Sequence, residues 1–382
     1  MHVLIAPNAF KHSLPADAAA AAILKGLQES SLTFTGESFP VGDGGDGTGD
    51  LLMTRLDALK ITFPARDPFG RNRTTYYGLT PDHDTAIIEM ANASGLRLLE
   101  STALDPLNAS SIGTGDLLRA ALDQNPRHIL LCLGGSATVD AGIGILSALG
   151  IRFLDDAGND LPPTPAHLTR LSTVDTLGLD PRLSGTRLTI LTDVDNPLTG
   201  PNGAAAVFGP QKGADAIAVQ KLETALQHLA RIIHRQLGID LSTLPSGGAA
   251  GGTAAGLYGL LGARLVHGID YFLDRTEFDK ALDRAQLVIT GEGSIDEQTL
   301  QGKGPFGVAC RAKKKGIPVI GLAGRLPTNR HPGLDDYFQA LLPINHTPLA
   351  LPAALGQAAA NLTATARAVG NLLTLSLPAR HQ

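Results

Sequence analysis

The alternation of hydrophobic and polar positions divides the chain into three stretches of different rhythm. Residues 1–60 read as strand, helix, strand, glycine-rich loop and helix, and the first helix has apolar residues at the spacing i, i+3, i+4, i+7. The elements expected here are a strand over 3–6, a helix opened by Pro15 and Asp17, a strand over 38–41 and a helix over 49–59. This order predicts the start of a parallel α/β sheet.

The rhythm changes near residue 60. Short strand patterns at 61–64, 73–79 and 85–89 are joined by turn sequences such as Asp67-Pro68-Phe69-Gly70. Because tight turns join neighbouring strands that run in opposite directions, these strands are expected to be antiparallel. Further elements expected in this stretch are strands over 128–133 and 187–193 and a helix over 216–237 that ends at Gly238.

The strand-helix rhythm returns near residue 286, with strands expected over 286–290, 318–322 and 337–343, a helix over 305–315 and an alanine-rich closing helix. The sequence therefore predicts an α/β protein of two domains. Residues 1–60 and 286–382 form a parallel-sheet domain from both termini, and residues 61–285 form an inserted α/β domain with a mixed or antiparallel sheet. A length of 382 residues suits two domains, since single cores stop growing near about 250–300 residues.

Composition and charge exclude several classes of protein. Hydrophobic residues make up 43% of the chain and charged residues 18%, which excludes a disordered protein. A net charge of −5 and an aromatic content of 4% argue against nucleic acid as a partner. The two cysteines, Cys132 and Cys310, lack the spacing of a metal or redox motif and are expected to be reduced.

No membrane partner is expected. The most apolar stretch, residues 130–151, is interrupted by Gly134, Gly135 and Asp140, so it reads as strand, loop and helix. The opening residues enter a strand directly, without a basic segment, and a cytoplasmic location is therefore expected.

Glycine-rich loops carry the candidate chemistry. The chain has no Walker A motif, since Gly302-Lys303-Gly304 lacks the upstream glycine and the following Ser or Thr, and it has no dinucleotide fingerprint. Several glycine loops that hold a carboxylate or a lysine instead follow predicted strands, at the sheet edge where α/β proteins bind ligands. Phosphoryl transfer needs cations or N–H groups for phosphate, carboxylates for Mg²⁺ and a positioned hydroxyl, and this set of loops supplies all three.

The loops also resemble those of a known family. Ala6-Pro7-Asn8-Ala9-Phe10-Lys11-His12-Ser13 resembles the Ala-Pro-Asp-Ser-Phe-Lys-Gly-Ser opening of the bacterial type I glycerate kinases. The loop Pro40-Val41-Gly42-Asp43-Gly44-Gly45-Asp46-Gly47-Thr48 is similar to that family's Pro-Val-Ala-Asp-Gly-Gly-Glu-Gly-Thr. Further segments are similar in the same order, at residues 89–96, 134–140, 193–198, 208–214 and 289–303.

The resemblance implies Mg²⁺- and ATP-dependent phosphorylation of glycerate, with D-glycerate giving 2-phosphoglycerate in a cleft between two domains, one of them flavodoxin-like. A monomer or homodimer is expected. The residues expected to act in catalysis are Lys11, Asp193 and Asp296, with the two aspartates also as Mg²⁺ ligands. Those expected to bind glycerate or ATP are Ser13, Asp43, Asp46, Ser94, Ser136, Lys212, Glu292 and Lys303. Turn-forming, capping and surface roles are the alternatives for these residues.

The sequence departs from the family pattern at Asn8, His12, Asp46 and Ser294, where Asp, Gly, Glu and Arg are usual. The changes at Asn8 and Ser294 remove a carboxylate and a possible anion clamp, which leaves open a catalytically impaired sensor of glycerate or nucleotide. Phosphorylation of a related hydroxy acid, or a 3-phosphoglycerate product, is a second alternative. A dinucleotide-dependent oxidoreductase is a third, and the missing fingerprint argues against it.

Overall fold

The computed structural model describes residues 1–329 and 331–375, without the side chains of Gln298 and Gln301. The chain divides into two compact units. The terminal unit comprises Met1–Asp43 and the residues from Ile269 onward, and the central unit comprises Gly44–Gly268. The unit boundaries thus fall between residues 43 and 44 and between 268 and 269, whereas the sequence analysis placed them after residue 60 and before residue 286. The helix over Thr48–Arg55 therefore belongs to the central unit, and residues 269–285 belong to the terminal unit.

The terminal unit is built on a parallel five-stranded sheet in the order β13-β12-β11-β1-β2. Its strands are β1 (His2–Ile5), β2 (Thr35–Ser38), β11 (Leu287–Ser294), β12 (Val319–Arg325) and β13 (Ala340–Pro343). Numbered within this sheet, the order is that of flavodoxin-like folds, and the predicted parallel sheet from both termini is confirmed. The strand order reverses between β1 and β11, which is where such sheets bind ligands.

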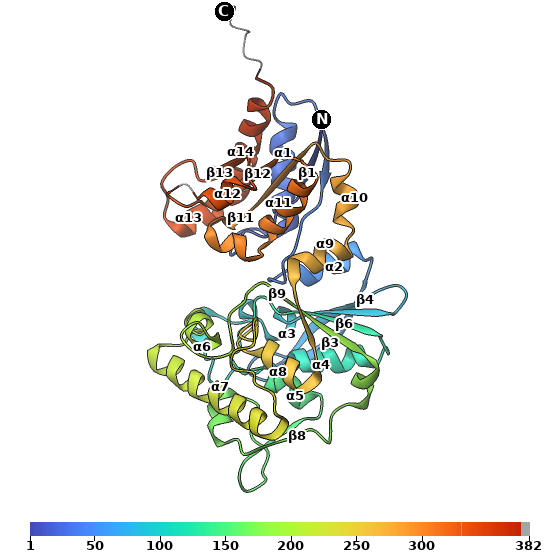
Figure 1. The fold of residues 1–382 in the computed structure, drawn as a ribbon, viewed down its shortest axis with the longest axis vertical. Coiled ribbons are helices and arrows are strands. Elements are labelled where there is room, and N and C mark those ends of the chain that lie inside the picture. The colour runs from blue at the N-terminus through green and yellow to red at the C-terminus, as the bar shows by residue number, and fades with distance from the viewer. Residues whose placement is uncertain (330, 376–382) are drawn as a thin grey trace, which may run out of the picture. The chain divides into compact units, whose positions relative to one another are not determined.

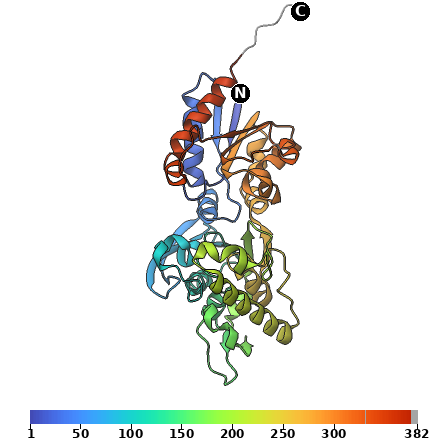
Figure 2. The same ribbon diagram turned by 90° about the vertical axis from the view of Figure 1, so that its left-hand side faces the viewer.

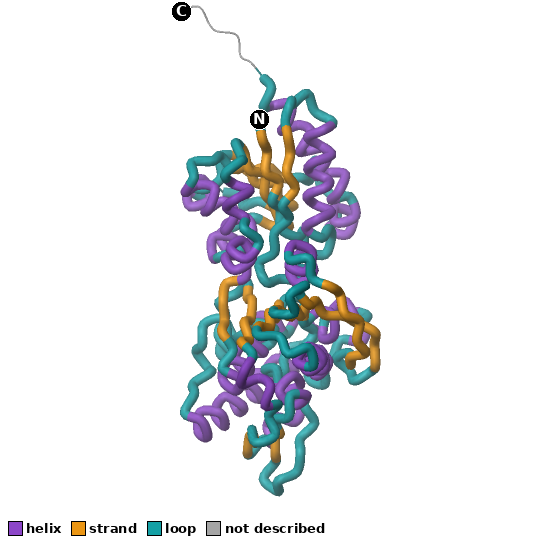
Figure 3. Tube along the Cα trace, turned by 90° about the vertical axis from the view of Figure 1, so that its right-hand side faces the viewer, coloured by secondary structure: helices purple, strands orange, loops and turns teal. Residues whose placement is uncertain are grey.

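Helices cover both faces of the terminal sheet (Figure 3). They are α1 (Ala16–Gln28), α9 (Gly268–Arg275), α10 (Phe278–Leu282), α11 (Gly304–Lys314), α12 (Pro332–Asp335), α13 (Leu351–Gly356) and α14 (Ala358–Leu372). The first and last of these, α1 and α14, lie side by side (Figures 1 and 2). Alternate residues of β1, Val3 and Ile5, pack in one core with Ile23 of α1 and Leu362 of α14, as the period of two in a strand requires.

The central unit contains a mixed six-stranded sheet in the order β10-β9-β6-β5-β4-β3. Its strands are β3 (Leu59–Arg66), β4 (Asn72–Leu79), β5 (Thr85–Glu89), β6 (His128–Cys132), β9 (Arg187–Thr192) and β10 (Arg264–His267). The predicted antiparallel pairing of the first three strands is confirmed, and β5, β6, β9 and β10 run parallel. A separate antiparallel ribbon joins β7 (Arg152–Leu154) and β8 (Thr173–Asp175).

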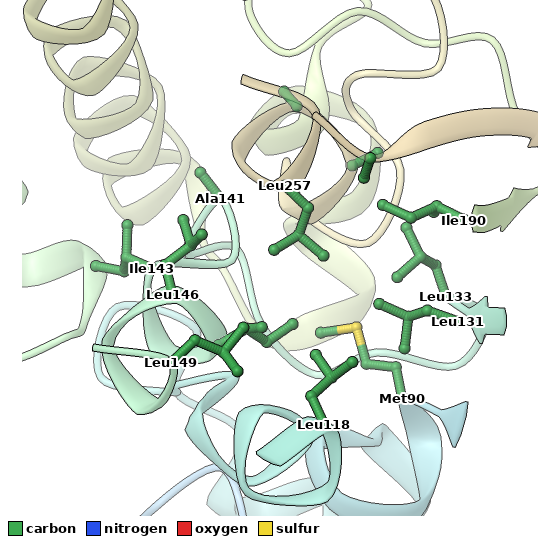
Figure 4. Close-up of a cluster of buried hydrophobic side chains, with 14 of the residues drawn as sticks. Met90, Leu118, Leu131, Leu133, Ala141, Ile143, Leu146, Leu149, Ile190 and Leu257 are labelled. Carbon is green, nitrogen blue, oxygen red and sulfur yellow. The ribbon is translucent and has the colours of Figure 1, made fainter. Parts of the chain in front are cut away.

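The core of the central unit lies between this sheet and its helices. The helices are α2 (Thr48–Arg55), α3 (Ala91–Ser94), α4 (Ile112–Leu122), α5 (Ile143–Ala148), α6 (Ala204–Phe208), α7 (Ala216–Leu237) and α8 (Thr253–Leu261). Figure 4 shows Leu118, Leu146 and Leu257 pointing from three of them toward Leu131 and Ile190 of the sheet. Burial of each such leucine contributes about 1.5–3 kcal/mol, so this layer of aliphatic contacts holds the loops at the sheet edge in place.

The strand predicted over 38–41 is displaced, since β2 covers Thr35–Ser38. Pro40 explains the difference, because it has no N–H to donate to a ladder. The backbone N–H groups of Phe39 and Val41 still donate to the carbonyls of Ile5 and Pro7, so the chain follows β1 beyond the strand end. Within the described residues, none of the helices is long and apolar enough to span a bilayer.

Candidate active site

The first group of candidate residues lies in the terminal unit, where the loops after β1 and β11 meet at the point of reversed strand order. The Asn8 N–H donates to the Gly291 carbonyl, which ties the loop after β1 to the end of β11. We call Asn8, Lys11, Asp43, Glu292 and Lys303 the terminal cluster. The N-terminus of α11, at Gly304, also faces this cluster.

Asp43 is held by two N–H donors. Its Oδ2 accepts hydrogen bonds from Nδ2 of Asn8 at 2.7 Å and from the backbone N of Gly304 at 3.3 Å. Oδ1 of Asn8 accepts in turn from the N–H of Ala9 at 2.8 Å, so the orientation of the Asn8 amide is fixed from both ends. A carboxylate next to a helix N-terminus is also favoured by the helix dipole.

Glu292 is a buried acid beside Asp43. Its side chain accepts a hydrogen bond from the hydroxyl of Thr299 at 3.1 Å, and only 7% of the residue is exposed. Burial, reinforced by the nearby Asp43 carboxylate, raises the pKa of Glu292 to about 8, although Lys303 and Lys11 are close enough to lower it. The structure therefore brings together two predicted acids and two predicted lysines.

Two further predicted residues of the terminal unit lie near these loops. Asp296 follows β11, its Oδ2 accepts from the hydroxyl of Ser294 at 3.1 Å, and its N–H donates to Oγ1 of Thr299. Ser13 donates its hydroxyl to the carbonyl of Leu355 at 2.7 Å, a contact that links the loop after β1 to α13. Asp296 is therefore oriented by its own turn, whereas the Ser13 hydroxyl is engaged by backbone.

The second group lies in the central unit, where β5 ends. Glu89 is completely buried and accepts hydrogen bonds from the backbone N–H groups of Gly47 and Asp50, at the start of α2. Burial and a hydrogen bond with Asp46 raise the pKa of Glu89 to about 8. Asp46 pairs with Arg97 at 2.9 Å, and Arg97 also donates to Oδ1 of Asn92. We call Asp46, Glu89, Asn92 and Arg97 the central cluster.

Only Asp46 of this cluster was among the predicted site residues. Glu89 and Asn92 stand in one of the quoted family segments, so the position of Glu89 at the end of a buried strand was a usable signal. Arg97 carried no such signal, because its contact with Asp46 joins residues 51 positions apart.

The glycine-rich loop after β6 packs directly against the loop that carries Asp46. The Gly134 N–H donates to the Gly44 carbonyl at 3.0 Å. A Cβ atom added at Gly134 would lie 2.1 Å from the Gly45 carbonyl carbon and 2.2 Å from the Asp46 nitrogen. Glycine is therefore required at this position by the close approach of two backbones.

Lys212 lies inside the fold and contacts this loop from within. Its Nζ donates to Oγ of Ser136 at 2.8 Å and to the carbonyl of Thr138 at 2.7 Å, and 2% of the residue is exposed. Burial lowers the pKa of Lys212 to about 7, while the charge of Asp140 opposes that shift. Lys212 and Ser136, both predicted site residues, are thus in contact.

Two other polar residues near this loop are saturated by internal hydrogen bonds. Asp140 accepts from the N–H and the hydroxyl of Ser111 and from the backbone N–H groups of Gly142 and Gly144. Oγ of Ser94 accepts from the N–H and the hydroxyl of Thr114 and is completely buried. The Ser94 contacts hold the start of α4, and the Asp140 contacts hold the starts of α4 and α5.

Asp193 directly follows β9 in the central unit and is partly exposed. Lys11, Asp43 and Asp296 belong to the terminal unit, so the structure groups the predicted residues into one set per unit. That all of them share one pocket stays a prediction.

Lys212→Met is expected to change how stability depends on pH. Between pH 7 and 10.5 the unfolded chain binds the Lys212 proton and the folded chain does not, so the folded wild type gains stability as pH rises through this window. Met avoids the burial penalty, so its advantage over the wild type should be largest at pH 7 or below and should shrink by about 1.4 kcal/mol per pH unit at most as pH rises.

Urea unfolding at several pH values from 6 to 10 measures this difference. Lys221→Met, at an exposed lysine of α7, is the matched control, and its difference in unfolding free energy from the wild type should not change with pH. If the difference for Lys212→Met also does not change with pH, burial does not shift the pKa of Lys212.

The carboxylates show no preformed metal cage. Among residues 1–329 and 331–375, no group of three or more His, Cys, Asp or Glu side chains could hold a metal ion.

Comparisons with known proteins match nearly the whole chain. Residues 3–374 match the model of the glycerate kinase family. The chain is 40% identical to a glycerate kinase of Bacillus subtilis strain 168, with 98% of each chain covered. It is also 40% identical to a protein named glycerate 2-kinase from Escherichia coli K12, with 90% of this chain and 91% of that protein covered.

A solved crystal structure of a Salmonella typhimurium LT2 protein described as a glycerate kinase 2 has a similar fold. The TM-score is 0.80, the sequence identity is 42%, and 98% of each chain is covered. The chain therefore belongs to the glycerate kinase family and is an enzyme.

Proposed function

We propose that this enzyme transfers the γ-phosphoryl group of ATP to glycerate, with Mg²⁺ entering as the ATP complex. The observation that carries the proposal is the terminal cluster, in which Lys11 and Lys303 lie beside Asp43 and Glu292 where the strand order reverses. Such a site offers cations for phosphate oxygens, which phosphoryl transfer needs. The full-length similarity to proteins named glycerate kinase supports glycerate as the acceptor.

Lys11 and Lys303 are proposed to bind phosphate oxygens. Both follow strands or precede a helix at the carboxyl edge of the terminal sheet, and Lys303 is the residue before α11, whose N-terminal N–H groups also favour an anion. Because Glu292 is protonated at neutral pH, it would not repel phosphate groups bound beside it. Charge stabilisation of this kind is the largest catalytic contribution expected for phosphoryl transfer.

Asp296 and Asp193 are proposed as the carboxylates that act on the reacting groups. One would accept the proton of the attacking hydroxyl and the other would contact nucleotide-bound Mg²⁺. Asp296 suits such a role better than Asp43, because both described contacts of Asp43 Oδ2 are to protein N–H donors. When bound, Mg²⁺ supplies positive charge to the β- and γ-phosphate oxygens.

The product is proposed to be 2-phosphoglycerate, formed from D-glycerate. The similarity to the Escherichia coli protein named glycerate 2-kinase supports the position of transfer. Assignment to the type I branch of the family rests on the loop motifs around Asn8 and Asp43, and the cytoplasmic location rests on the low cysteine content.

Incubation with ATP, Mg²⁺ and either D- or L-glycerate tests the proposal. We expect ADP release that depends on D-glycerate, and a phosphorus NMR signal of 2-phosphoglycerate. A 3-phosphoglycerate signal would correct the regiochemistry. Nucleotide or glycerate binding without any ADP release would show a sensor and would sink the proposed function.

A further inference from the structure

The buried pair of Asn8 and Asp43 determines what the terminal cluster can bind. Nδ2 of Asn8 lies 2.7 Å from Oδ2 of Asp43, and the Gly304 N–H donates to the same oxygen. A carboxylate oxygen has two lone pairs, and both are directed here to N–H groups of the protein. The residues concerned, Asn8 and Asp43, are 8% and 6% exposed, so water competes little for these bonds.

The remaining charges of the cluster also disfavour a cation. Glu292 is buried, accepts from the Thr299 hydroxyl, and has its pKa raised so that its proton is retained at neutral pH. Lys11 and Lys303 lie close enough to act on Glu292 electrostatically. An added divalent ion would therefore be repelled by two lysines and would find Asp43 Oδ2 already bonded to two N–H donors, whereas divalent ions seek several oxygen ligands.

We infer that Asn8 keeps the terminal cluster from holding a divalent cation by itself, so that the enzyme takes up Mg²⁺ only as the nucleotide complex. Asn8 is in this sense a positioning residue, since it acts through Asp43. An aspartate at this position would place a second carboxylate oxygen where the amide nitrogen lies, 2.7 Å from Oδ2 of Asp43. Two carboxylates that close must share a proton or a cation. The inference rests on the proposed function for the role of the nucleotide.

Titration with Mn²⁺ alone, without nucleotide or glycerate, tests it. The signal of free Mn²⁺ in electron paramagnetic resonance reports binding directly and needs no activity. We expect the wild type to leave Mn²⁺ free, and Asn8→Asp to bind it at least about tenfold more tightly. Asn345→Asp adds the same charge at an exposed asparagine of the same unit and should behave as the wild type.

The reversed pair, Asn8→Asp with Asp43→Asn, restores one amide and one carboxylate and should return to the wild-type level. The inference is overturned if the wild type binds Mn²⁺ as tightly as Asn8→Asp, or if the reversed pair does. Thermal unfolding shows whether Asn8→Asp is folded. If it is not, Asn8→Ala takes its place, since it removes the amide donor to Asp43; a measurable gain in Mn²⁺ affinity supports the inference and no gain overturns it. Failure of the proposed function would appear separately, as missing ADP release.

Discussion

Asp296→Asn is expected to lower kcat for glycerate phosphorylation by about 10²–10⁴-fold, the usual contribution of a positioned carboxylate in proton transfer. The variant keeps the shape of the side chain and can still accept from the Ser294 hydroxyl, so the fold should survive. Asp193→Asn in the central unit is expected to have an effect of similar size. Steady-state kinetics and a thermal unfolding curve of each variant measure the two expectations together.

The control is Asp17→Asn, which removes an exposed carboxylate from the first turn of α1 in the terminal unit. It should leave kcat unchanged within about twofold, the scatter of a surface substitution. Near-normal turnover in both Asp296→Asn and Asp193→Asn would show that the proposed roles of these residues are wrong.

Gly134→Ala is expected to produce the second large effect, on stability as well as activity. The new Cβ would meet two backbone atoms, the Gly45 carbonyl carbon at 2.1 Å and the Asp46 nitrogen at 2.2 Å, and neither can rotate away. Forced repacking of this kind costs about 1–3 kcal/mol. Because the displaced loop carries Asp46, turnover should fall even at temperatures where the variant is fully folded.

Urea unfolding and kinetics at low temperature separate the two effects. Gly185→Ala serves as the matched control, since a Cβ at Gly185 has no described atom within 4 Å and the residue belongs to the same unit. If Gly134→Ala is as stable and as active as Gly185→Ala, the close packing of the two loops has no bearing on function.

Much of the fold follows from patterns that a single sequence displays. The helix α7 begins and ends where its apolar spacing and Gly238 predict, because an amphipathic stripe and a left-handed glycine are both local signals. β2 was misplaced because burial of Phe39 and Val41 continues past the point where Pro40 interrupts the ladder. No helix was predicted over α4, because the segment from Ile112 contains two glycines in its first turn.

The candidate site was predictable to the extent that its residues lie at or just beyond the carboxyl ends of strands. Asp43 and Glu292 were found in this way, because the carboxyl ends of parallel strands share an edge. The burial of Lys212 and the partners of Arg97 could not be predicted, since each depends on side-chain contacts between segments distant in sequence. Conversely, Ser94 proved to be enclosed by the Thr114 contacts, a local environment that its glycine-flanked motif does not reveal.

We propose that one phosphoryl transfer uses candidate residues of both units, Lys11, Asp296 and Lys303 in the terminal unit and Asp46, Ser136 and Asp193 in the central unit. Hydrogen–deuterium exchange of the enzyme with glycerate and a non-hydrolysable ATP analogue tests it most directly. The account predicts slower amide exchange in both sets of loops, residues 8–11 and 292–303 in the terminal unit and residues 44–47 and 134–138 in the central unit. Protection confined to one unit, or absent from both, would contradict it.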